Sequence, residues 1–401
     1  MGTEFKAITS GTVTSPQGFL AGAVEAGIKG KGELDLAILC SEKPCLAAGV
    51  FTTAAIKSAP VILSREHLKA GKARAVVVNS GCANACTGDS GMADAVDMAK
   101  LVSEKLGLPA EDVLVASTGV IGVPLPMERV RAGIRKVVLA REGAHDLARA
   151  IMTTDTFPKE IAVSVGSKSG KFIIGGVAKG AGMIHPDMAT MLCFLTTDAA
   201  VEARFLQSAL QKAVDVSFNM VTVDGDTSPS DTVAILANGL AGTEKINSGN
   251  GELFQKALDE VCLYLAKSVA RDGEGATKLI EVTVEGALDD RQARLAARIV
   301  AGSPLFKAAV HGNDPNWGRV VAALGRSGAK VDESKLEVYL NDVCVMKQGS
   351  PVPFDRQKLS AGLAGREVSV RLRLNLGRGK AVAWGCDLSE EYVTINSAYT
   401  S

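Results

Sequence analysis

The sequence predicts a mixed α/β fold in which helices cover buried strands. Short β-branched runs, such as residues 74–79 and 113–117, alternate along the chain with Ala-rich amphipathic segments. Near the C-terminus, apolar and basic residues alternate within residues 368–376, which is typical of a strand with one buried and one solvated face. With 47 % hydrophobic and 22 % charged residues, the chain has the composition of a globular protein that can build such a fold.

The first predicted elements form one strand–helix–strand unit. Residues 74–79 (RAVVVN) and 113–117 (VLVAS) are predicted to be buried strands, because β-branched runs there end at small turn residues. Between them, residues 91–106 place apolar side chains at three- and four-residue steps, and Gly107 then provides a helix C-terminal signal. The same reasoning predicts strands at 171–177, 192–197, 280–284 and 336–340, and helices at 202–216 and 253–269.

The net charge and the lack of a signal-peptide or membrane-spanning pattern argue against several classes of protein. The chain has 44 Lys+Arg and 44 Asp+Glu, so its formal charge is 44 − 44 = 0, whereas a nucleic-acid binder normally carries a basic surplus. Residues 1–19 lack the apolar run of a signal peptide, and no stretch approaches the roughly 18 apolar residues of a membrane span. At roughly 150 residues per domain, the length corresponds to two or three folding units or to one large α/β unit. We therefore expect a soluble, cytoplasmic protein that binds neither nucleic acid nor membrane.

Signatures of metal and nucleotide sites are weak. The chain has neither a P-loop nor a dinucleotide-binding glycine pattern, and its eight cysteines contain no C-x-x-C pair. Cys82 and Cys86 lack a nearby histidine, and Asp224, Asp226 and Asp231 lack the spacing of a calcium loop. Turn capping explains these aspartates equally well. We expect no metal and no bound cofactor.

The most informative segment is residues 179–198 (KGAGMIHPDMATMLCFLTTD). A glycine-rich turn leads into Pro186, after which Ala189 and Thr190 stand at the head of a predicted buried strand. A threonine in this place could attack the carbonyl that precedes it if the turn strains that peptide bond, and the small Ala189 leaves room for the tetrahedral intermediate. Many strands begin with threonine, so the residues alone leave self-cleavage and an ordinary strand start both open.

The same segment resembles the cleavage region of the ArgJ family of arginine biosynthesis, the ornithine acetyltransferases or glutamate N-acetyltransferases. Further blocks resemble that family in the same order from Gly49 to the C-terminus. The chain departs from the family pattern at Cys82, where we expect Asn, although Asn79 and Asn84 remain on either side. The matching blocks are 49–53 (GVFTT), 78–88 (VNSGCANACTG), 116–122 (ASTGVIG), 152–156 (MTTDT), 222–227 (TVDGDT), 272–278 (DGEGATK) and 396–399 (NSAY).

The resemblance implies a fold and a maturation step. The implied fold is a four-layer αββα sandwich. The implied precursor cuts itself between Ala189 and Thr190, which would give an α chain of residues 1–189 and a β chain of residues 190–401. The two chains are expected to stay associated and to pair into an α2β2 heterotetramer.

The implied activity is acetyl transfer from N2-acetyl-L-ornithine to L-glutamate. The free α-amine of Thr190 would take the proton of the Thr190 hydroxyl, because an α-amine has a pKa of about 7.7 to 8.0. The hydroxyl would store the acetyl group as an ester until glutamate accepts it, in a ping-pong cycle. By resemblance, the Thr118 hydroxyl and the Gly119 backbone N–H stabilise the oxyanion.

The resemblance also implies which residues bind the substrates. Lys179 suits the α-carboxylate that both substrates carry, and Glu274 suits the cationic amine of ornithine. The mapping of Ser401 would bring the C-terminus into the active site. The implied substrate-binding residues are Thr153, Lys179, Thr190, Glu274, Asn396 and Ser401.

Three alternatives stay open at this stage. The enzyme either uses acetylornithine alone or is bifunctional and also takes acetyl-CoA as a donor. A self-processing amidase or aminopeptidase would use the same nucleophile and pass the acyl group to water. A non-catalytic amino-acid-binding protein would use Lys179 and Glu274 in one uncut chain, and Thr118 and Gly119 would then only lead a strand into a turn.

Overall fold

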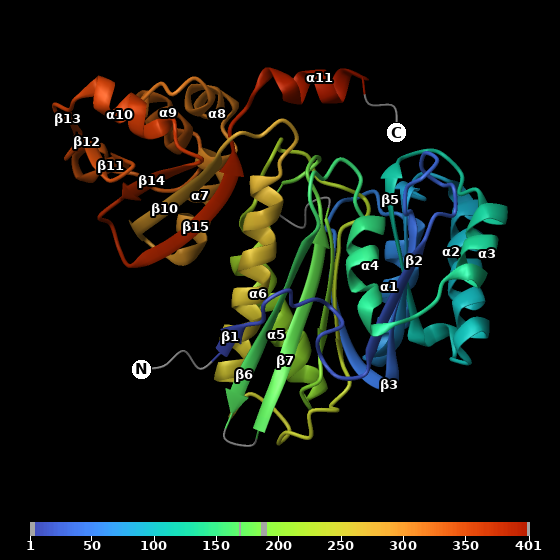
Figure 1. Cartoon of the computed structure of the whole chain (residues 1–401). Coiled ribbons are helices and arrows are strands. Elements are labelled where there is room, and N and C mark those ends of the chain that lie inside the picture. Colours follow the sequence, from blue (N-terminus) through green and yellow to red (C-terminus); the bar gives the residue numbers. More distant parts are fainter. Residues whose placement is uncertain (1–4, 168–169, 186–190, 399–401) are drawn as a thin grey trace.

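The computed structural model describes residues 5–167, 170–185 and 191–398. This part of the chain forms two β-sheets, one of nine strands and one of six, and helices pack on both. Figure 1 shows the larger sheet in the body of the molecule and the smaller sheet in a lobe beside its upper end. The predicted mixed α/β fold is confirmed.

The larger sheet has the strand order β1-β6-β7-β8-β9-β3-β4-β5, and β2 pairs with β3. β4 runs parallel to β5 and β8 runs parallel to β9, whereas the other neighbouring pairs are antiparallel. The strands are β1 (Phe5–Ala7), β2 (Phe19–Val24), β3 (Leu36–Phe51), β4 (Lys72–Cys82), β5 (Val113–Val120), β6 (Lys159–Ser167), β7 (Gly170–Lys179), β8 (Leu192–Thr197) and β9 (Thr232–Ala237).

The long strand β3 joins the two halves of this sheet. Residues 36–40 of β3 pair with β4, and residues 46–51 pair with β9. The register of the β3–β4 pair shifts between Cys40 and Cys45. β3 thereby belongs to both halves, and the sheet continues from one half into the other.

The alternation of side chains along the strands sorts the core into three apolar clusters. On β4, Val76 belongs to the cluster shared by the two halves of the sheet, while Val77 packs with the cluster beneath α1 to α3. On β9, Leu236 joins the shared cluster, while Ile235 packs with α5 and α6. α4 also contributes to the shared cluster, and Figure 1 shows it between the halves.

The layers are therefore α1 to α3, the two halves of the nine-stranded sheet, and α5 with α6. This order confirms the four-layer αββα sandwich. The helices of this body are α1 (Ala59–His67), α2 (Gly88–Leu106), α3 (Met127–Lys136), α4 (Ala144–Ala150), α5 (Ala203–Val216) and α6 (Glu252–Arg271). Short 3-10 helices lie at Leu68–Ala70, Ala110–Asp112, Arg141–Gly143, Phe218–Met220 and, in the second lobe, Glu333–Lys335.

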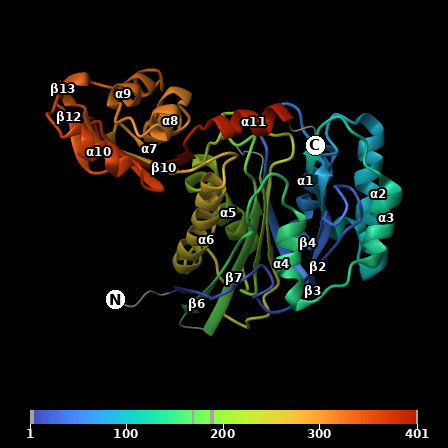
Figure 2. The ribbon, with the colours of Figure 1, turned by 45° about the horizontal axis from the view of Figure 1, so that its top comes forward.

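The second lobe carries the six-stranded sheet, in the order β13-β12-β11-β14-β10-β15. One buried apolar cluster runs from α5 and α6 into this sheet, so the lobes share a core. Figures 1 and 2 show α11 leaving the lobe and crossing the end of the sandwich. The elements are β10 (Leu279–Ala287), β11 (Glu337–Leu340), β12 (Val343–Lys347), β13 (Ser350–Pro351), β14 (Glu367–Arg373), β15 (Gly379–Cys386), α7 (Asp290–Ala301), α8 (Pro304–His311), α9 (Trp317–Gly325), α10 (Arg356–Leu363) and α11 (Glu390–Ala398).

Most of the predicted elements agree with the structure to within a few residues. The helix predicted at 91–106 lies within α2, and Gly107 ends it with φ +64°, a left-handed conformation that favours glycine. The strand predicted at 368–376 is shorter, because β14 ends at Arg373. In the described ranges, no helix is both long and apolar enough to cross a bilayer.

Strands from the two sides of the predicted cut interleave in the larger sheet. β8 and β9 follow residue 190, yet they lie between β7 on one side and β3 on the other, both of which precede residue 189. Leu192 of β8 pairs with Lys179 of β7 and with Thr232 of β9. The head of β8 therefore lies in the interior of the sheet.

Candidate active site

Six of the predicted site residues line one cavity of about 340 Å³. They come from segments far apart in the sequence, and the fold gathers them near the ends of β5 and β7. The predicted residues Ala189, Thr190 and Ser401 lie outside the described residues. The six residues are Thr118, Gly119, Thr153, Lys179, Glu274 and Asn396. The rest of the lining was not predicted as site residues and consists of Ala83, Val120, Ile121, Thr154, Gly182, Met183, Ser228, Pro229 and Ser230.

Thr118 and Gly119 lie near the end of β5, where the strand reaches the cavity. Gly119 has φ +128°, and a Cβ atom there would lie 2.3 Å from the carbonyl carbon of Gly81 on the neighbouring strand β4. Only glycine fits this close approach of two backbones. The same glycine therefore lies at the exit of the strand and lines the cavity.

Lys179 ends β7, and its ammonium group reaches the cavity although the residue is only 2 % exposed. It donates hydrogen bonds to the Thr153 hydroxyl at 2.7 Å and to the Thr118 hydroxyl at 3.3 Å. Burial lowers the pKa of Lys179, and the nearby carboxylate of Asp155 opposes that effect. Three polar groups on one wall are thus positioned together.

A chain of buried charges supports Lys179 from behind. The Lys179 ammonium lies 3.9 Å from Asp155, and Lys159 bridges Asp155 at 2.6 Å and Asp272 at 2.5 Å. Asp155 also accepts a 2.6 Å hydrogen bond from the Gly180 backbone N–H. Burial acts to raise the pKa of Asp155, but Lys179 and Lys159 outweigh it and lower this pKa to about 2. No sequence pattern predicted these roles, although Asp155 and Asp272 lie in the blocks 152–156 and 272–278 that resemble the ArgJ family.

Glu274 forms another part of the cavity wall. Its backbone N–H donates to the Ala181 carbonyl at 2.9 Å, and its carboxylate accepts a 2.7 Å hydrogen bond from the Asn396 side chain. A Cβ atom at Gly182 would lie about 2.4 Å from that carboxylate, so glycine leaves room for it. Asn396 belongs to α11, and the contact therefore brings the helix that leaves the second lobe to the cavity.

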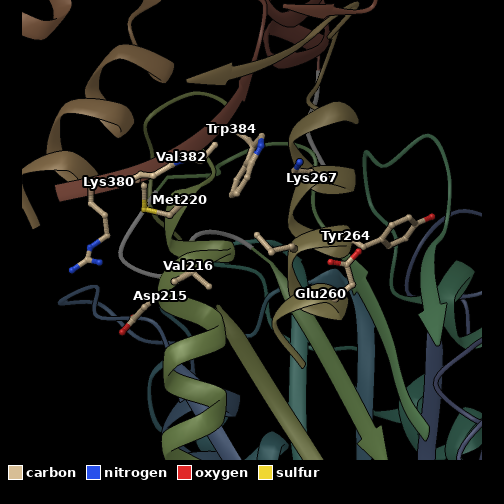
Figure 3. A pocket seen from close by; sticks show the side chains of 12 residues that line it. Asp215, Val216, Met220, Glu260, Tyr264, Lys267, Lys380, Val382 and Trp384 are labelled. Atoms are coloured by element: carbon tan, nitrogen blue, oxygen red, sulfur yellow. The ribbon is translucent and has the colours of Figure 1, made fainter. Parts of the chain in front are cut away.

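A larger groove of about 490 Å³ lies between the lobes, but none of the predicted site residues line it. Figure 3 shows Val382 and Trp384 of β15 opposite side chains of α5 and α6. The Lys267 ammonium in this groove lies 5.1 Å from the centre of the Trp384 ring and 3.1 Å from the Glu281 carboxylate. The smaller cavity, with hydroxyl, amide, ammonium and carboxylate groups together, is therefore the candidate active site.

This arrangement combines two chemical capacities. The Thr118 hydroxyl and the Gly119 N–H are donors of the kind that stabilise an oxyanion. Lys179 and Glu274 provide charges of opposite sign in the same cavity, which suits a small ligand that itself carries both charges.

The chain is similar to ArgJ proteins over its whole length. It is 54 % identical to the arginine biosynthesis bifunctional protein ArgJ of Dehalococcoides mccartyi, with 100 % of both chains covered. The corresponding protein of Symbiobacterium thermophilum is also 54 % identical, over 97 % of this chain and 98 % of that relative. The ArgJ family matches residues 20–401. The chain belongs to the ArgJ family.

A solved structure of the family agrees with this membership. The crystal structure of the arginine biosynthesis bifunctional protein argJ from Bacillus halodurans is 42 % identical, with a TM-score of 0.50. The match covers 98 % of that chain but 51 % of this one. Membership in the ArgJ family confirms the resemblance inferred from the blocks along the sequence.

Proposed function

We propose that this member of the ArgJ family transfers an acetyl group from N2-acetyl-L-ornithine to L-glutamate in arginine biosynthesis. The observation that carries the proposal is the cavity in which Thr118, Gly119 and Lys179 lie together with Glu274. These residues supply oxyanion donors and two opposite charges for a small amino-acid substrate. Relatives covered over their full length bear the name of the arginine-biosynthesis ArgJ protein.

The proposed nucleophile is the hydroxyl of Thr190, whose role rests on the resemblance of residues 179–198 to the family. The α-amine of Thr190 takes the hydroxyl proton while the oxygen attacks the acetyl carbonyl carbon. A C–O bond forms, the C–N bond to ornithine breaks, and the proton leaves with the ornithine amine. Glutamate then attacks the acetyl ester through its own amine, the C–O bond breaks, and Thr190 regains its proton.

The cavity residues have separate tasks in these two steps. The Thr118 hydroxyl and the Gly119 N–H stabilise the negative oxygen of each tetrahedral intermediate. Lys179 pairs with the substrate α-carboxylate, and its contacts with Thr118 and Thr153 link carboxylate binding to the oxyanion donors. Glu274 binds the side-chain ammonium of ornithine, held by Asn396.

Self-cleavage between Ala189 and Thr190 supplies the free amine that this chemistry needs. The proposed β chain has 401 − 189 = 212 residues, which is about half of the precursor. The Bacillus halodurans chain, matched over 98 % of its length, likewise covers 51 % of this chain, which supports a division near the middle. The family resemblance further supports an α2β2 assembly and a cytoplasmic location. Light scattering of the purified enzyme measures the mass of the assembly and thereby tests the α2β2 composition.

The decisive experiment incubates the purified enzyme with acetylornithine and glutamate in the absence of coenzyme A. Ornithine and N-acetylglutamate should appear in equal amounts, and the Thr190→Ala chain should produce neither. Release of free acetate in place of N-acetylglutamate would identify the amidase alternative. An uncut wild-type chain on a denaturing gel, with no product, would favour the amino-acid-binding alternative.

A second donor is favoured by the relatives, whose names describe bifunctional proteins. We propose acetyl-CoA as that donor, with the same Thr190 ester as the intermediate and no bound cofactor. Glutamate acetylation is measured with each donor alone. A rate with acetyl-CoA no higher than that of the Thr190→Ala chain would restrict the enzyme to acetylornithine.

A further inference from the structure

A further cavity of about 490 Å³, the Phe157 cavity, lies where the end of α6 meets the starts of β10 and β14. It contains none of the residues proposed to bind acetylornithine or glutamate. Phe157 lines it together with Arg271 and Arg366. An aromatic ring beside guanidinium groups suits a nucleotide, because the ring stacks on the base and a guanidinium binds the phosphate.

The Phe157 ring is positioned as a stacking surface. The residue is 37 % exposed in the cavity, although phenylalanine is among the residue types that are most often buried. The buried Lys159 ammonium lies 4.8 Å from the centre of the ring, and Asp155 and Asp272 hold this ammonium in turn. The ring is therefore fixed from the interior of the protein before any ligand binds.

The charges of the cavity favour a phosphate group. Three cationic side chains and one carboxylate line it, those of Arg271, Lys278, Arg366 and Glu367. Glu367 pairs with Arg271, and the Lys278 ammonium donates to the Val310 carbonyl. Arg366 is exposed, and its side chain makes no hydrogen bond or ion pair with any described residue. Its guanidinium is therefore available to bind a phosphate through two parallel hydrogen bonds.

Two short chain segments join the Phe157 cavity to the candidate active site. Thr154 lines the active-site cavity, and three residues separated along the chain in this way lie at most about 11 Å from Phe157. Glu274 of the active-site cavity and Ala276 of the Phe157 cavity are two residues apart, which limits their separation to about 7 Å. Thr156 in the first segment is exposed, so a ligand can pass over this segment.

We propose that the Phe157 cavity binds the nucleotide end of acetyl-CoA while the thioester end enters the candidate active site. This inference rests on acetyl-CoA as the second donor in the proposed function. The active-site cavity of about 340 Å³ suits an amino acid, and acetyl-CoA is much larger, so its nucleotide must lie outside that cavity. The extended pantetheine arm is longer than the gap between the two cavities. Adenine stacks on Phe157, and Arg366 binds a phosphate.

The two donors therefore differ in the residues that they need. Acetylornithine carries no nucleotide and is bound within the active-site cavity alone. Acetyl-CoA uses both cavities, although its acetyl group is transferred at the same site. Changes in the Phe157 cavity should weaken the binding of one donor and leave that of the other unchanged.

Steady-state kinetics with each donor and glutamate test this assignment. Arg366→Gln removes the guanidinium charge, and KM for acetyl-CoA should rise at least about tenfold, the scale of a charge-assisted hydrogen bond. Phe157→Leu keeps an apolar side chain without the ring, and the same KM should rise at least about fivefold. KM and kcat with acetylornithine should not change. Arg326→Gln is the control, because Arg326 is an exposed arginine at the end of α9 and lines none of the three cavities described.

Adenosine 3′,5′-bisphosphate is the second probe, because it has the nucleotide of coenzyme A without the arm. It should bind the wild-type chain in calorimetry, bind more weakly to Arg366→Gln and Phe157→Leu, and compete with acetyl-CoA but not with acetylornithine. An unchanged KM for acetyl-CoA in both variants would overturn the inference, and so would an equal rise in KM for both donors.

The bisphosphate also separates this inference from the proposed second donor. A wild-type chain that does not use acetyl-CoA, but binds the bisphosphate through Arg366 and Phe157, would support the nucleotide site and contradict only the second donor. A chain that neither uses acetyl-CoA nor binds the bisphosphate would overturn both.

Discussion

The Asn396 side-chain amide donates a 2.7 Å hydrogen bond to the Glu274 carboxylate, and this contact ties α11 to the candidate active site. α11 has no buried residue of its own, and at its start the Glu390 carboxylate lies 3.3 Å from the His311 imidazole. Figure 2 shows this helix crossing the end of the sandwich. The Glu274 carboxylate is therefore oriented by a side chain of the helix that leaves the second lobe.

Replacing Asn396 by Ala should weaken substrate binding more than the chemical step. Without the amide, the Glu274 carboxylate loses its partner and samples more orientations, so we expect KM for acetylornithine to rise about tenfold, the scale of one charge-assisted hydrogen bond. Steady-state kinetics measure the effect. Ser397→Ala is the control, because the Ser397 hydroxyl donates to the Thr394 carbonyl of the same helix and its loss should leave KM unchanged. A fall in kcat at constant KM would contradict this role.

Extending the C-terminus should lower activity. α11 reaches the cavity through Asn396, and a bulky tag placed a few residues later would compete for space near the site. The same tag at the N-terminus is the control, since β1 lies at the edge of the larger sheet. Full activity with the C-terminal tag would remove Ser401 from the proposed binding residues.

Thr118→Val should reduce kcat by about 100- to 1000-fold, because it removes one oxyanion donor and keeps the side-chain shape. The Lys179 ammonium also loses its 3.3 Å contact with this hydroxyl. Thr394→Val is a matched control, since the Thr394 hydroxyl bonds the Glu390 carbonyl of its own exposed helix. Rates measured with saturating acetylornithine and glutamate test the prediction, and an unchanged kcat would exclude Thr118 from the oxyanion site.

Lys159→Met should destabilise the fold by about 3 to 5 kcal/mol, because it leaves Asp155 and Asp272 as buried carboxylates without their shared cation. Urea unfolding of the Thr190→Ala chain, in which only one chain is present, measures the difference. Lys171→Met is the control, since Lys171 lies on the exposed part of β7. A loss below about 1 kcal/mol would mean that the two carboxylates are not charged partners of Lys159.

The stability of the fold should also fall in acid because of Asp155. The pKa of Asp155 is about 2 in the folded chain and lies below the ordinary 3.8. Its contribution to the free energy of unfolding is therefore complete above about pH 4 and is lost as the pH falls toward 2. At 1.36 kcal/mol per pKa unit, this contribution is about 2 kcal/mol. Urea midpoints between pH 5 and pH 2, in the Thr190→Ala background, should change less when Asp155→Asn is added. Asp342→Asn is the control at an exposed site, and this variant should show the same fall in urea midpoint between pH 5 and pH 2 as the parent chain.

Regular periodicity made many elements predictable, and its interruption explains what was missed. The predicted helices at α2, α5 and α6 and the strand β8 follow uniform apolar patterns. β3 was not predicted because residues 41–44 (SEKP) place charged residues and a proline in the middle of it. These residues lie where the register of β3 with β4 shifts, and residues 42–44 are exposed there.

The candidate site was predictable only in part. Resemblance to the family named the residues that meet in the cavity, but it did not reveal how they are supported. Lys159 looks like a surface residue in the sequence, since buried lysines are rare unless they are paired. Its partner Asp272 lies 113 residues away, and only the fold brings the two together.

The interleaving of strands in the larger sheet affects the thermal inactivation of the enzyme. The uncut chain folds with β8 and β9 tethered to β7, whereas two separated pieces would have to find each other and insert β8 and β9 between β7 and β3. For two separated pieces, the entropic cost of association adds to the slow pairing of distant strands. We therefore expect thermal inactivation of the cut enzyme to be irreversible, so that the height of the unfolding barrier sets its working lifetime.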